Sequence, residues 1–255
     1  MKNVLPKNIM RDVVTWNVTT STIALVGSIL GFGIIGVNSA QAAIFGANLI
    51  INGDAEAGSG SASGDDVLPV PDWTTTGNFT VVQYNASGGF PTATDPGPVN
   101  RGNNFFAGGP SNAASSASQV IDVLAGSGII DVGNALFNLS GFLGGFDGQG
   151  DNAVFQAFFR DASNATLGTA SIGPVTLGDR AGLTGLLERS TSGQVPLGTR
   201  TILVELNMIR FSGFYNDGYA DNLSLVLTNT TPPPTSVPEP SSKIGRAHVW
   251  TPVTL

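Results

Sequence analysis

Short apolar runs separated by clusters of Gly, Ser, Thr and Asn recur along most of this chain. The clearest run lies between residues 201 and 210, where every second residue is a large apolar one: Ile202, Val204, Leu206 and Met208. Successive side chains of a strand point to opposite faces, so this alternation predicts a strand with one buried face. Short strands that follow one another between such turn clusters are typical of an antiparallel sandwich.

Nine strands are predicted on this basis. Their ranges are 48–51, 79–84, 104–107, 117–123, 135–145, 153–161, 166–172, 201–210 and 221–227. In 153–161 phenylalanines occupy both alternating sets of positions, and one set is expected to lie in the core. A short helix or turn is expected at 179–187, with Asp179 as its N-cap. Residues 58–66 and 86–103 are predicted to be long loops, of the size that often borders a functional rim.

The N-terminus carries Lys2, Lys7 and Arg11 ahead of an uncharged apolar run from residue 22 to 37. This run is about sixteen residues long, shorter than the ~20 residues of a membrane-spanning helix. The small residues that follow it end at Ala42 and are typical of a signal-peptidase site. We expect residues 1–42 to be a signal-peptide helix that signal peptidase removes after Ala42. The alternative is an uncleaved membrane anchor, and in both cases we expect the rest of the chain to lie outside the cytoplasm.

The composition changes after Leu227 to a Pro- and Thr-rich stretch, which predicts an extended linker. Within it, Pro238, Glu239 and Pro240 stand in the segment VPEPSS. This segment, in its position after a linker near the end of an exported chain, resembles the sorting signal of PEP-CTERM proteins. The resemblance implies recognition by exosortase and delivery to the cell surface or extracellular matrix of a Gram-negative bacterium. The predicted organisation is a sandwich domain at 43–228 followed by the linker and motif at 229–242.

Residues 243–255 depart from the PEP-CTERM pattern, because they form neither an apolar span nor a basic tail. Residues 244–254 match the translation of a common sequencing-adapter strand in which a TGA codon is read as Trp250. We interpret this tail as foreign to the natural protein; a genuine divergent tail is the alternative. His248, the only histidine, lies within it, and the chain has no cysteine. Without them, a Ser-His-Asp triad, a Cys nucleophile and the usual zinc and copper sites are excluded.

Residues 43–242 contain six arginines, no lysine and seventeen acidic residues. Proteins that bind nucleic acid or anionic membranes need basic side chains to replace condensed counterions. We therefore expect no nucleic-acid partner, and contact with a membrane only through the sorting signals. An acidic surface outside the cell also suits calcium, which prefers carboxylate and carbonyl oxygens.

The segments NLIINGDAEAG, from residue 48, and DGYADNLSL, from residue 217, resemble the opening and closing segments of jelly-roll carbohydrate-binding modules and other galactose-binding-like sandwiches. That resemblance implies a jelly-roll-like β-sandwich whose first and last strands are neighbours, with a structural Ca²⁺ between them. It also implies that Glu56 and Asp221 are side-chain ligands and that Asp54 is a third. The alternative is that Asp54 and Asp221 accept turn hydrogen bonds and that Glu56 is solvated.

Sugar binding requires exposed aromatic faces beside groups that form hydrogen bonds. Tyr215 and Tyr219 flank Asn216 and Asp217 in a Gly/Asn/Asp-rich turn, which makes these four residues candidates for ligand binding. Trp73 is a further candidate, with a place in the core as its alternative. Other aromatic residues that meet the requirement are Tyr84, Phe90 and Phe214.

The function expected from these observations is that of an exported, non-catalytic surface or matrix protein that associates with extracellular polysaccharide. A purely structural or adhesive matrix protein is the first alternative. The second is a glycoside hydrolase, which would need two carboxylates on either side of the scissile bond. Glu188 and Glu205 are the available glutamates for such a pair, but no clustered acidic motif accompanies them.

Overall fold

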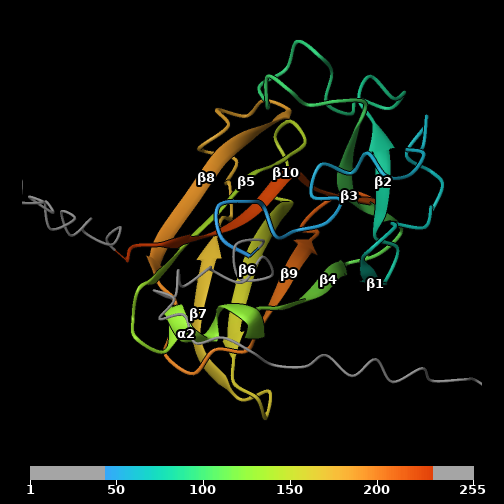
Figure 1. Cartoon of the computed structure of the whole chain (residues 1–255). Coiled ribbons are helices and arrows are strands. Elements are labelled where there is room, and N and C mark those ends of the chain that lie inside the picture. Colours follow the sequence, from blue (N-terminus) through green and yellow to red (C-terminus); the bar gives the residue numbers. More distant parts are fainter. Residues whose placement is uncertain (1–43, 232–255) are drawn as a thin grey trace, which may run out of the picture. The chain divides into compact units, whose positions relative to one another are not determined.

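The computed structural model describes residues 44–231, which fold into two antiparallel sheets of five strands each (Figure 1). The first sheet has the order β2-β3-β10-β5-β8, with bounds Thr80–Gln83, Asn104–Pro110, Tyr215–Asn229, Ala135–Gly145 and Gly185–Gln194. The second sheet has the order β1-β4-β9-β6-β7, with bounds Thr74–Thr76, Ala114–Asp122, Thr201–Ile209, Asn152–Arg160 and Thr166–Ile172. Two short helical elements, η1 (Leu124–Gly126) and α2 (Ser127–Ile130), connect β4 to β5.

This arrangement confirms the predicted jelly-roll-like β-sandwich. The main core lies between the sheets, and the four alternating side chains predicted at 202, 204, 206 and 208 are all fully buried in it. On β6, Phe155 and Phe159 are buried in the same core, whereas Phe158 faces outward and is half-buried. Eight of the nine predicted strands are present, most with ends shifted by a few residues.

The strand predicted at 48–51 is not a strand. Asn48 forms only an isolated bridge to Val226 of β10, and a turn begins at Ile51 because Asn52 adopts a positive φ of 51°. Two backbone bonds nevertheless hold this segment against β10, from Gly46 N to Leu227 O (2.8 Å) and from Leu49 N to Leu225 O (2.9 Å). The beginning and the end of the domain therefore lie side by side.

The helix or turn predicted at 179–187 is only a turn, and β8, which the prediction missed, begins at Gly185. Asp179 accepts a hydrogen bond from Thr176 N (2.8 Å) and closes this turn, while Gly182, with φ of 75°, ends it. Leu186 and Leu187 point to opposite faces of the first sheet, as residues of a strand do. The leucines have the spacing of a helix in the sequence, but the segment forms a strand because they are buried on opposite faces of the sheet. Strand β1 was also missed.

A second hydrophobic cluster covers the outer face of the first sheet where β2, β3 and β10 meet. We call it the outer cluster; it consists of Val82, Tyr84, Phe90, Phe105, Ala107, Leu186 and Tyr219. Phe90 comes from the long loop between β2 and β3, which folds back over the sheet. Its ring fits closely against Gly64, where a Cβ atom would lie 2.2 Å from Phe90 Cζ. The two predicted long loops are thus packed together by aromatic contacts.

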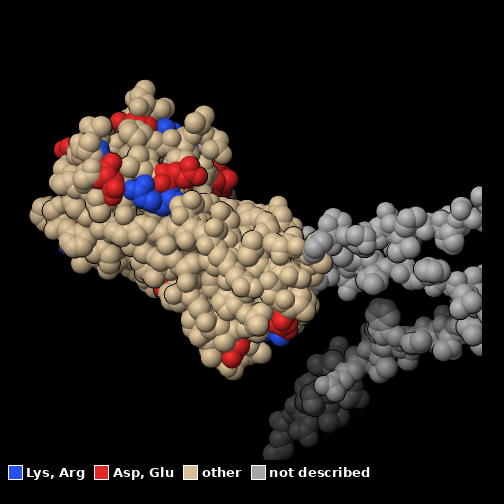
Figure 2. All heavy atoms as spheres, turned by 90° about the vertical axis from the view of Figure 1, so that its left-hand side faces the viewer, with Lys and Arg blue, Asp and Glu red and all other residues tan. Residues whose placement is uncertain are grey.

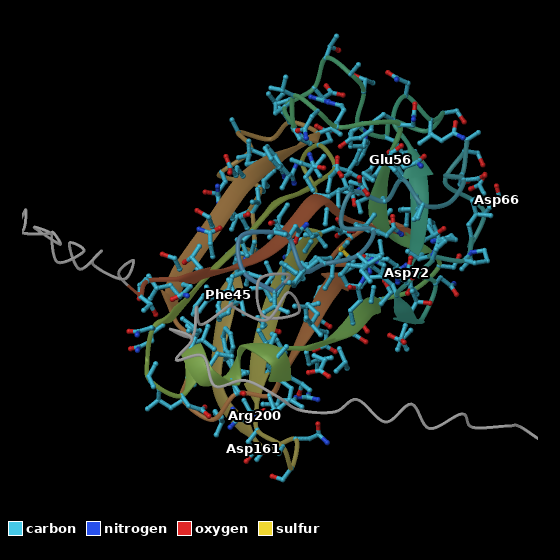
Figure 3. The ribbon with its side chains drawn as sticks, in the orientation of Figure 1. Phe45, Glu56, Asp66, Asp72, Asp161 and Arg200 are labelled. Carbon is cyan, nitrogen blue, oxygen red and sulfur yellow. The ribbon has the colours of Figure 1, made fainter. Side chains whose placement is uncertain are left out.

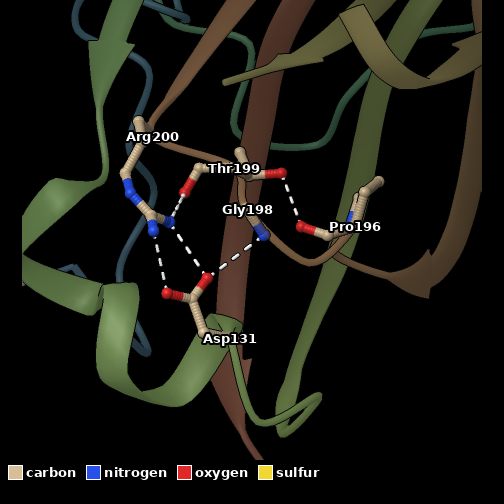
Figure 4. Close-up of polar contacts among 5 residues, drawn as sticks. All are labelled: Asp131, Pro196, Gly198, Thr199 and Arg200. Carbon is tan, nitrogen blue, oxygen red and sulfur yellow. Dashed lines mark hydrogen bonds and ion pairs between the residues drawn. The ribbon is translucent and has the colours of Figure 1, made fainter. Parts of the chain in front are cut away.

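At the end of the sandwich where α2 lies, an exposed ion pair joins the end of α2 to the β8–β9 loop (Figure 4). Asp131 accepts two hydrogen bonds from Arg200 (3.0 and 2.8 Å) and one from Gly198 N (3.1 Å), and the bonds from Arg200 lower the pKa of its carboxyl group. Figure 3 places Arg200 and Asp161 at this end and Glu56 near β2 and β3. On the face drawn in Figure 2, charged side chains gather toward both ends and leave a broad uncharged area between them.

The predicted signal peptide at 1–42, the sorting motif at Pro238, Glu239 and Pro240, and the tail at 243–255 lie outside the described residues. Among residues 44–231, no helix has the length and apolar character needed to cross a membrane.

Candidate functional site

An open pocket of about 280 Å³ lies at the end of the sandwich where four connecting segments meet. We call it the end pocket. Its wall combines aromatic rings with carboxylate, amide and hydroxyl groups: Phe90, Phe146, Phe214 and Tyr215 with Asp65, Asp217, Gln149 and Ser63, beside Gly88. The segments are the loop before β1, the loop after β2, the loop after β5, and the β9–β10 connection with the start of β10. Both predicted long loops contribute to its rim.

The aromatic part of the end pocket ranges from fully exposed to deeply buried. Phe214 is 90% exposed, whereas Phe90 is buried in the outer cluster below. Tyr215 lies between them, half-buried, and its ring meets that of Phe90 edge-on at 5.1 Å between centroids. The Tyr215 hydroxyl is buried and has no hydrogen-bond partner among the described residues. Burial and the nearby charges of Asp217 and Asp65 raise the pKa of this hydroxyl.

Asp217 is the buried acid of the end pocket, with only 7% of its surface exposed. Its Oδ1 accepts a hydrogen bond from the Tyr219 hydroxyl at 2.5 Å. Burial raises the pKa of Asp217 to about 6, and the charge of Asp151 adds to this effect, while the Tyr219 bond and the charge of Arg180 oppose it. A pKa near 6 means that the group changes charge close to neutral pH.

Two buried charged residues hold the segments around the end pocket in place. Asp151 accepts hydrogen bonds from Phe211 N (2.6 Å), Ser212 N (3.0 Å) and Asp217 N (3.0 Å), which fix the β9–β10 connection. Arg180, which is 4% exposed, donates to the carbonyl oxygens of Asp147 (3.1 Å), Gln149 (3.0 Å) and Leu183. These bonds satisfy backbone groups of irregular loops, which would otherwise be costly to bury.

The structure places the predicted ligand-binding residues in different environments. Tyr215 and Asp217 line the end pocket, but Tyr219 and Asn216 do not, and both are fully buried. Tyr219 follows Asp217 by two positions on the same strand, so its ring points into the outer cluster under the β2–β3 loop. Asn216 fastens the turn by donating to Met208 O (3.1 Å) and accepting from Gly218 N (3.3 Å). The prediction that these two residues face a sugar is wrong.

Trp73 belongs to the main core, so its prediction as a ligand platform is also wrong. It is 8% exposed, and its ring packs edge-on against Phe106 at 5.6 Å. Its Nε1 donates to Asn52 O at 3.0 Å, which satisfies the only polar atom of the buried ring. The core position that was weighed for this residue is the correct one.

The three predicted calcium ligands lie in the region where the opening segment meets β10. Asp221 is fully buried, and its carboxylate accepts hydrogen bonds from the Tyr84 hydroxyl (2.7 Å) and from Asn222 N (2.7 Å). Burial raises its pKa to about 8, with smaller contributions from the charges of Glu56 and Asp54, while the hydrogen bonds from Tyr84 and Asn222 oppose the increase. Asp54 is exposed. Nowhere in residues 44–231 do three acidic or histidine side chains converge as a ready metal cluster.

Glu56 is held by the start of β3. Its Oε1 accepts hydrogen bonds from Asn103 N (2.8 Å) and Asn104 N (2.7 Å), and its Oε2 accepts from Asn103 Nδ2 (3.0 Å). The residue at 102 must be glycine here, because it has φ of 64° and a Cβ would lie 2.6 Å from Glu56 Oε1. Glu56 therefore ties the opening segment to the first sheet and is not merely solvated.

The glutamates of the hydrolase alternative do not form a pair. Glu188 lies on β8 of the first sheet and Glu205 on β9 of the second. Leu187 and the neighbours of Glu205, Val204 and Leu206, point into the main core, so both glutamates point outward from opposite sheets. The paired carboxylates of glycoside hydrolases lie about 5–10 Å apart across one sugar. This arrangement does not provide that spacing.

Sequence reasoning missed four residues of the end pocket: Ser63, Asp65, Phe146 and Gln149. All four lie in loops, where alternation carries no information. Two features of the sequence could have indicated these residues: the length of the predicted loops 58–66 and 86–103, and the run of Gly and Asp around Phe146 and Gln149.

No protein-family profile matches this chain, and no curated protein matches its sequence. Among solved structures, it is similar to the enzymatically active domain of bacteriophage CBA120 tailspike protein 4 (TM-score 0.42, 18% identity), covering 71% of this chain and 21% of the tailspike chain. It is also similar to a family 61 carbohydrate-binding module in complex with β-1,4-galactotriose (TM-score 0.40, 14% identity, 72% of this chain and 99% of the module). A third similar structure is a family 16 carbohydrate-binding module (TM-score 0.38, 18% identity, 70% and 99%).

The chain thus spans about a fifth of the tailspike protein and nearly all of the two modules. Most of these structures are carbohydrate-binding modules and one is an enzymatic domain. At these TM-scores and identities no residue role transfers from them to this chain, and the sandwich is established by its own strand pairing.

Proposed function

We propose that this protein is an exported, non-catalytic component of a bacterial cell surface or extracellular matrix, and that it binds polysaccharide through the end pocket. The observation that carries the proposal is the make-up of that pocket. Aromatic rings of graded exposure stand beside carboxylate, amide and hydroxyl groups that can bond to sugar hydroxyls. An apolar wall with a few placed polar groups is the usual chemistry of a small-ligand site.

Export belongs to the same proposal. It is supported by the signal-peptide pattern of residues 1–42 and by the resemblance of the segment around Pro238, Glu239 and Pro240 to an exosortase sorting signal. Signal peptidase and exosortase are the processing partners in this proposal. The excess of acidic over basic residues between 43 and 242 supports a partner other than nucleic acid or anionic membrane.

A structural Ca²⁺ at Asp221, Glu56 and Asp54 is the second part of the proposal. Its physical support is the fully buried carboxylate of Asp221, which has neighbouring acidic charges and no ion pair within residues 44–231. A buried carboxylate is costly unless a cation or a proton neutralises it. The donors present are oxygens, which suit a hard cation. Such an ion would stabilise the junction of the opening segment with β10.

The experiment is a glycan panel probed with the 43–231 domain in the presence of calcium. Phe214→Ala removes an exposed ring of the pocket, so we expect it to weaken binding at least tenfold without a change in melting temperature. Phe211→Ala is the matched control, because Phe211 is also exposed (68%) on the same connection but does not line the pocket. Equal effects of the two variants would contradict the site. A silent panel would favour the purely structural matrix protein, and release of reducing ends would favour a hydrolase.

A further inference from the structure

The end pocket holds two carboxylates within an aromatic wall. Asp65 is exposed at its rim and Asp217 is buried in its floor, and four aromatic rings complete the lining. Aromatic faces carry a negative potential that attracts cations, by roughly 0.5–2 kcal/mol per ring. The carboxylates add to the attraction, and both contributions favour a positive ligand.

Among the described residues, no basic side chain lines the pocket or forms an ion pair with these acids, although the charge of Arg180 lowers the pKa of Asp217. Arg180, the nearest buried base, spends its terminal nitrogens on loop carbonyl oxygens, and Arg210 donates to the Phe214 carbonyl oxygen at 2.7 Å. Neither arginine lines the pocket. Both ion pairs within residues 44–231 involve other acids, Asp179 and Asp131. The pocket offers an anionic sugar such as a uronate no basic side chain, and its two acids would repel the carboxylate.

The polar groups of the pocket are themselves short of partners. Among the described residues Asp217 takes a side-chain bond only from Tyr219, and the Tyr215 hydroxyl takes none. Burial outweighs the charge of Arg180 and raises the pKa of Asp217, so a positive charge in direct contact with this carboxylate is missing. A ligand that brings a cation would supply that charge and form charge-assisted hydrogen bonds, which are about twice as strong as neutral ones.

We propose that the end pocket selects a protonated primary amine, carried by an amino-sugar unit of the polysaccharide. The preference for an amine is inferred from the residues of the pocket alone. That the amine belongs to a sugar rests on the function proposed above. A volume of about 280 Å³ is slightly below the ~300–1,000 Å³ of sites for drug-sized ligands, which suits a single sugar ring. Gln149 and Ser63 offer amide and hydroxyl groups for the ring hydroxyls.

The test compares three oligosaccharides by calorimetry at pH 6.5, where glucosamine amines are protonated to a large extent, with the 43–231 domain: glucosamine oligomers, N-acetylglucosamine oligomers and oligouronates. We expect glucosamine oligomers to bind at least tenfold more tightly than the N-acetylated ones and oligouronates not to bind. Asp65→Asn should remove most of this preference, and its fold is safe because the side chain is exposed and makes no side-chain hydrogen bond. Asp72→Asn, at another exposed acid outside the pocket, is the control and should leave all affinities unchanged.

Tetramethylammonium is the fourth probe and separates the two proposals. Equal affinity for glucosamine and N-acetylglucosamine oligomers overturns the amine selectivity and leaves polysaccharide binding standing. Tetramethylammonium could bind while no oligosaccharide does. If Asp65→Asn and Phe214→Ala then weaken that binding, the cation site is supported, and a polysaccharide is overturned as the source of the cation. If none of the four probes binds, the inference is overturned as well.

Discussion

The hydroxyl of Tyr219, in a position without solvent contact, donates a hydrogen bond of 2.5 Å to Asp217 at the pocket floor. The two residues stand two positions apart on β10, so they share one face of the strand. Tyr219 thereby joins the outer cluster to the pocket: its ring packs against Phe105 at 5.2 Å while its oxygen holds the acid. Tyr219 does not line the pocket, yet it positions Asp217, which does.

Tyr219→Phe should destabilise the domain by about 1.5–3 kcal/mol, because the ring packing is kept while a bond to a buried carboxylate is lost. The same change should raise the pKa of Asp217 further, since the Tyr219 bond lowers it. Urea unfolding measures the first effect, and the carboxyl ¹³C shift of Asp217 against pH measures the second. An unchanged pKa together with a stability loss below 0.5 kcal/mol would contradict the role given to this hydroxyl.

Asp217 should make the domain less stable as the pH rises from about 4 to 6. Its pKa is near the ordinary value of 3.8 in the unfolded chain and about 6 in the folded one. Between these values the folded state holds a proton that the unfolded state has lost, so the free energy of unfolding falls with rising pH, by about 1 kcal/mol per pH unit. Because Asp217 in the folded state is still half protonated at pH 6, this contribution becomes constant only above about pH 7.

The measurement for this pH effect is the stability difference between Asp217→Asn and the natural sequence, because other titrating groups cancel in it. The difference should shift in favour of the variant from pH 4 to 6 and stay constant from pH 7 to 8. The charged and titratable groups around Asp217 are Asp151, Arg180, Tyr215 and Tyr219, and the raised pKa values of the two tyrosine hydroxyls keep them neutral in this range. A difference that does not vary with pH would show that Asp217 titrates normally.

Calcium should raise the melting temperature if it binds at Asp221, Glu56 and Asp54. A ligand that binds only the folded state at 100 times its Kd adds about 2.7 kcal/mol. For a domain of this size that corresponds to roughly 5–10 °C. We expect EDTA to remove this increase and Glu56→Gln to abolish the response, whereas Asp72→Asn should respond normally. Identical melting curves in calcium and EDTA would exclude the metal.

Asn48→Ala should loosen the junction between the opening segment and β10. The Asn48 side chain donates to Leu223 O (3.0 Å) and accepts from Ile50 N (3.1 Å) and Leu225 N (3.0 Å). Losing three such bonds should cost about 1–3 kcal/mol, since the backbone groups left behind are partly buried. Hydrogen exchange should show faster exchange at Leu225 with little change in the second sheet. Uniform acceleration in both sheets would argue against a local role.

Trp73→Ala should cost about 3–5 kcal/mol in chemical unfolding, as removal of a large core side chain does. Phe214→Ala should cost less than 0.5 kcal/mol, because that ring is 90% exposed. The contrast between two aromatic residues, one in the core and one at the pocket, checks the environments described here. Similar losses for both would contradict them.

Most of the fold could be predicted from the sequence because strands such as β9 carry an apolar residue at every second position, and this alternation reports which face is buried. β8 was not predicted, because its sequence lacks this alternation. It is an edge strand whose run RSTSGQ faces solvent on much of its surface, so it lacks an apolar set to reveal it. Leu186 and Leu187, each buried on a different face, looked like part of a helix.

The candidate site was harder to predict, because exposure at the start of β10 depends on which loop covers it. Tyr215 and Tyr219 have the same chemistry and similar neighbours in sequence, yet the β2–β3 loop buries only the second completely. That covering depends on Phe90, more than a hundred residues away in the chain. Asp65 and Gln149 reach the pocket through loops whose paths no local pattern encodes.

Strand β10 also determines how the pocket would be displayed. It starts at the pocket with Tyr215 and ends fourteen residues later at Asn229, beside the opening segment. At ~3.3 Å per residue, the pocket and the end of β10 at Asn229 are separated by about 45 Å. A molecule attached to a support through the residues after Asn229 would therefore hold its aromatic and acidic recess on the far side, facing the surrounding medium. Attachment through the first or the last residues of the domain should leave ligand binding intact, whereas insertion of another protein into the loops around Phe90 or Phe214 should block it.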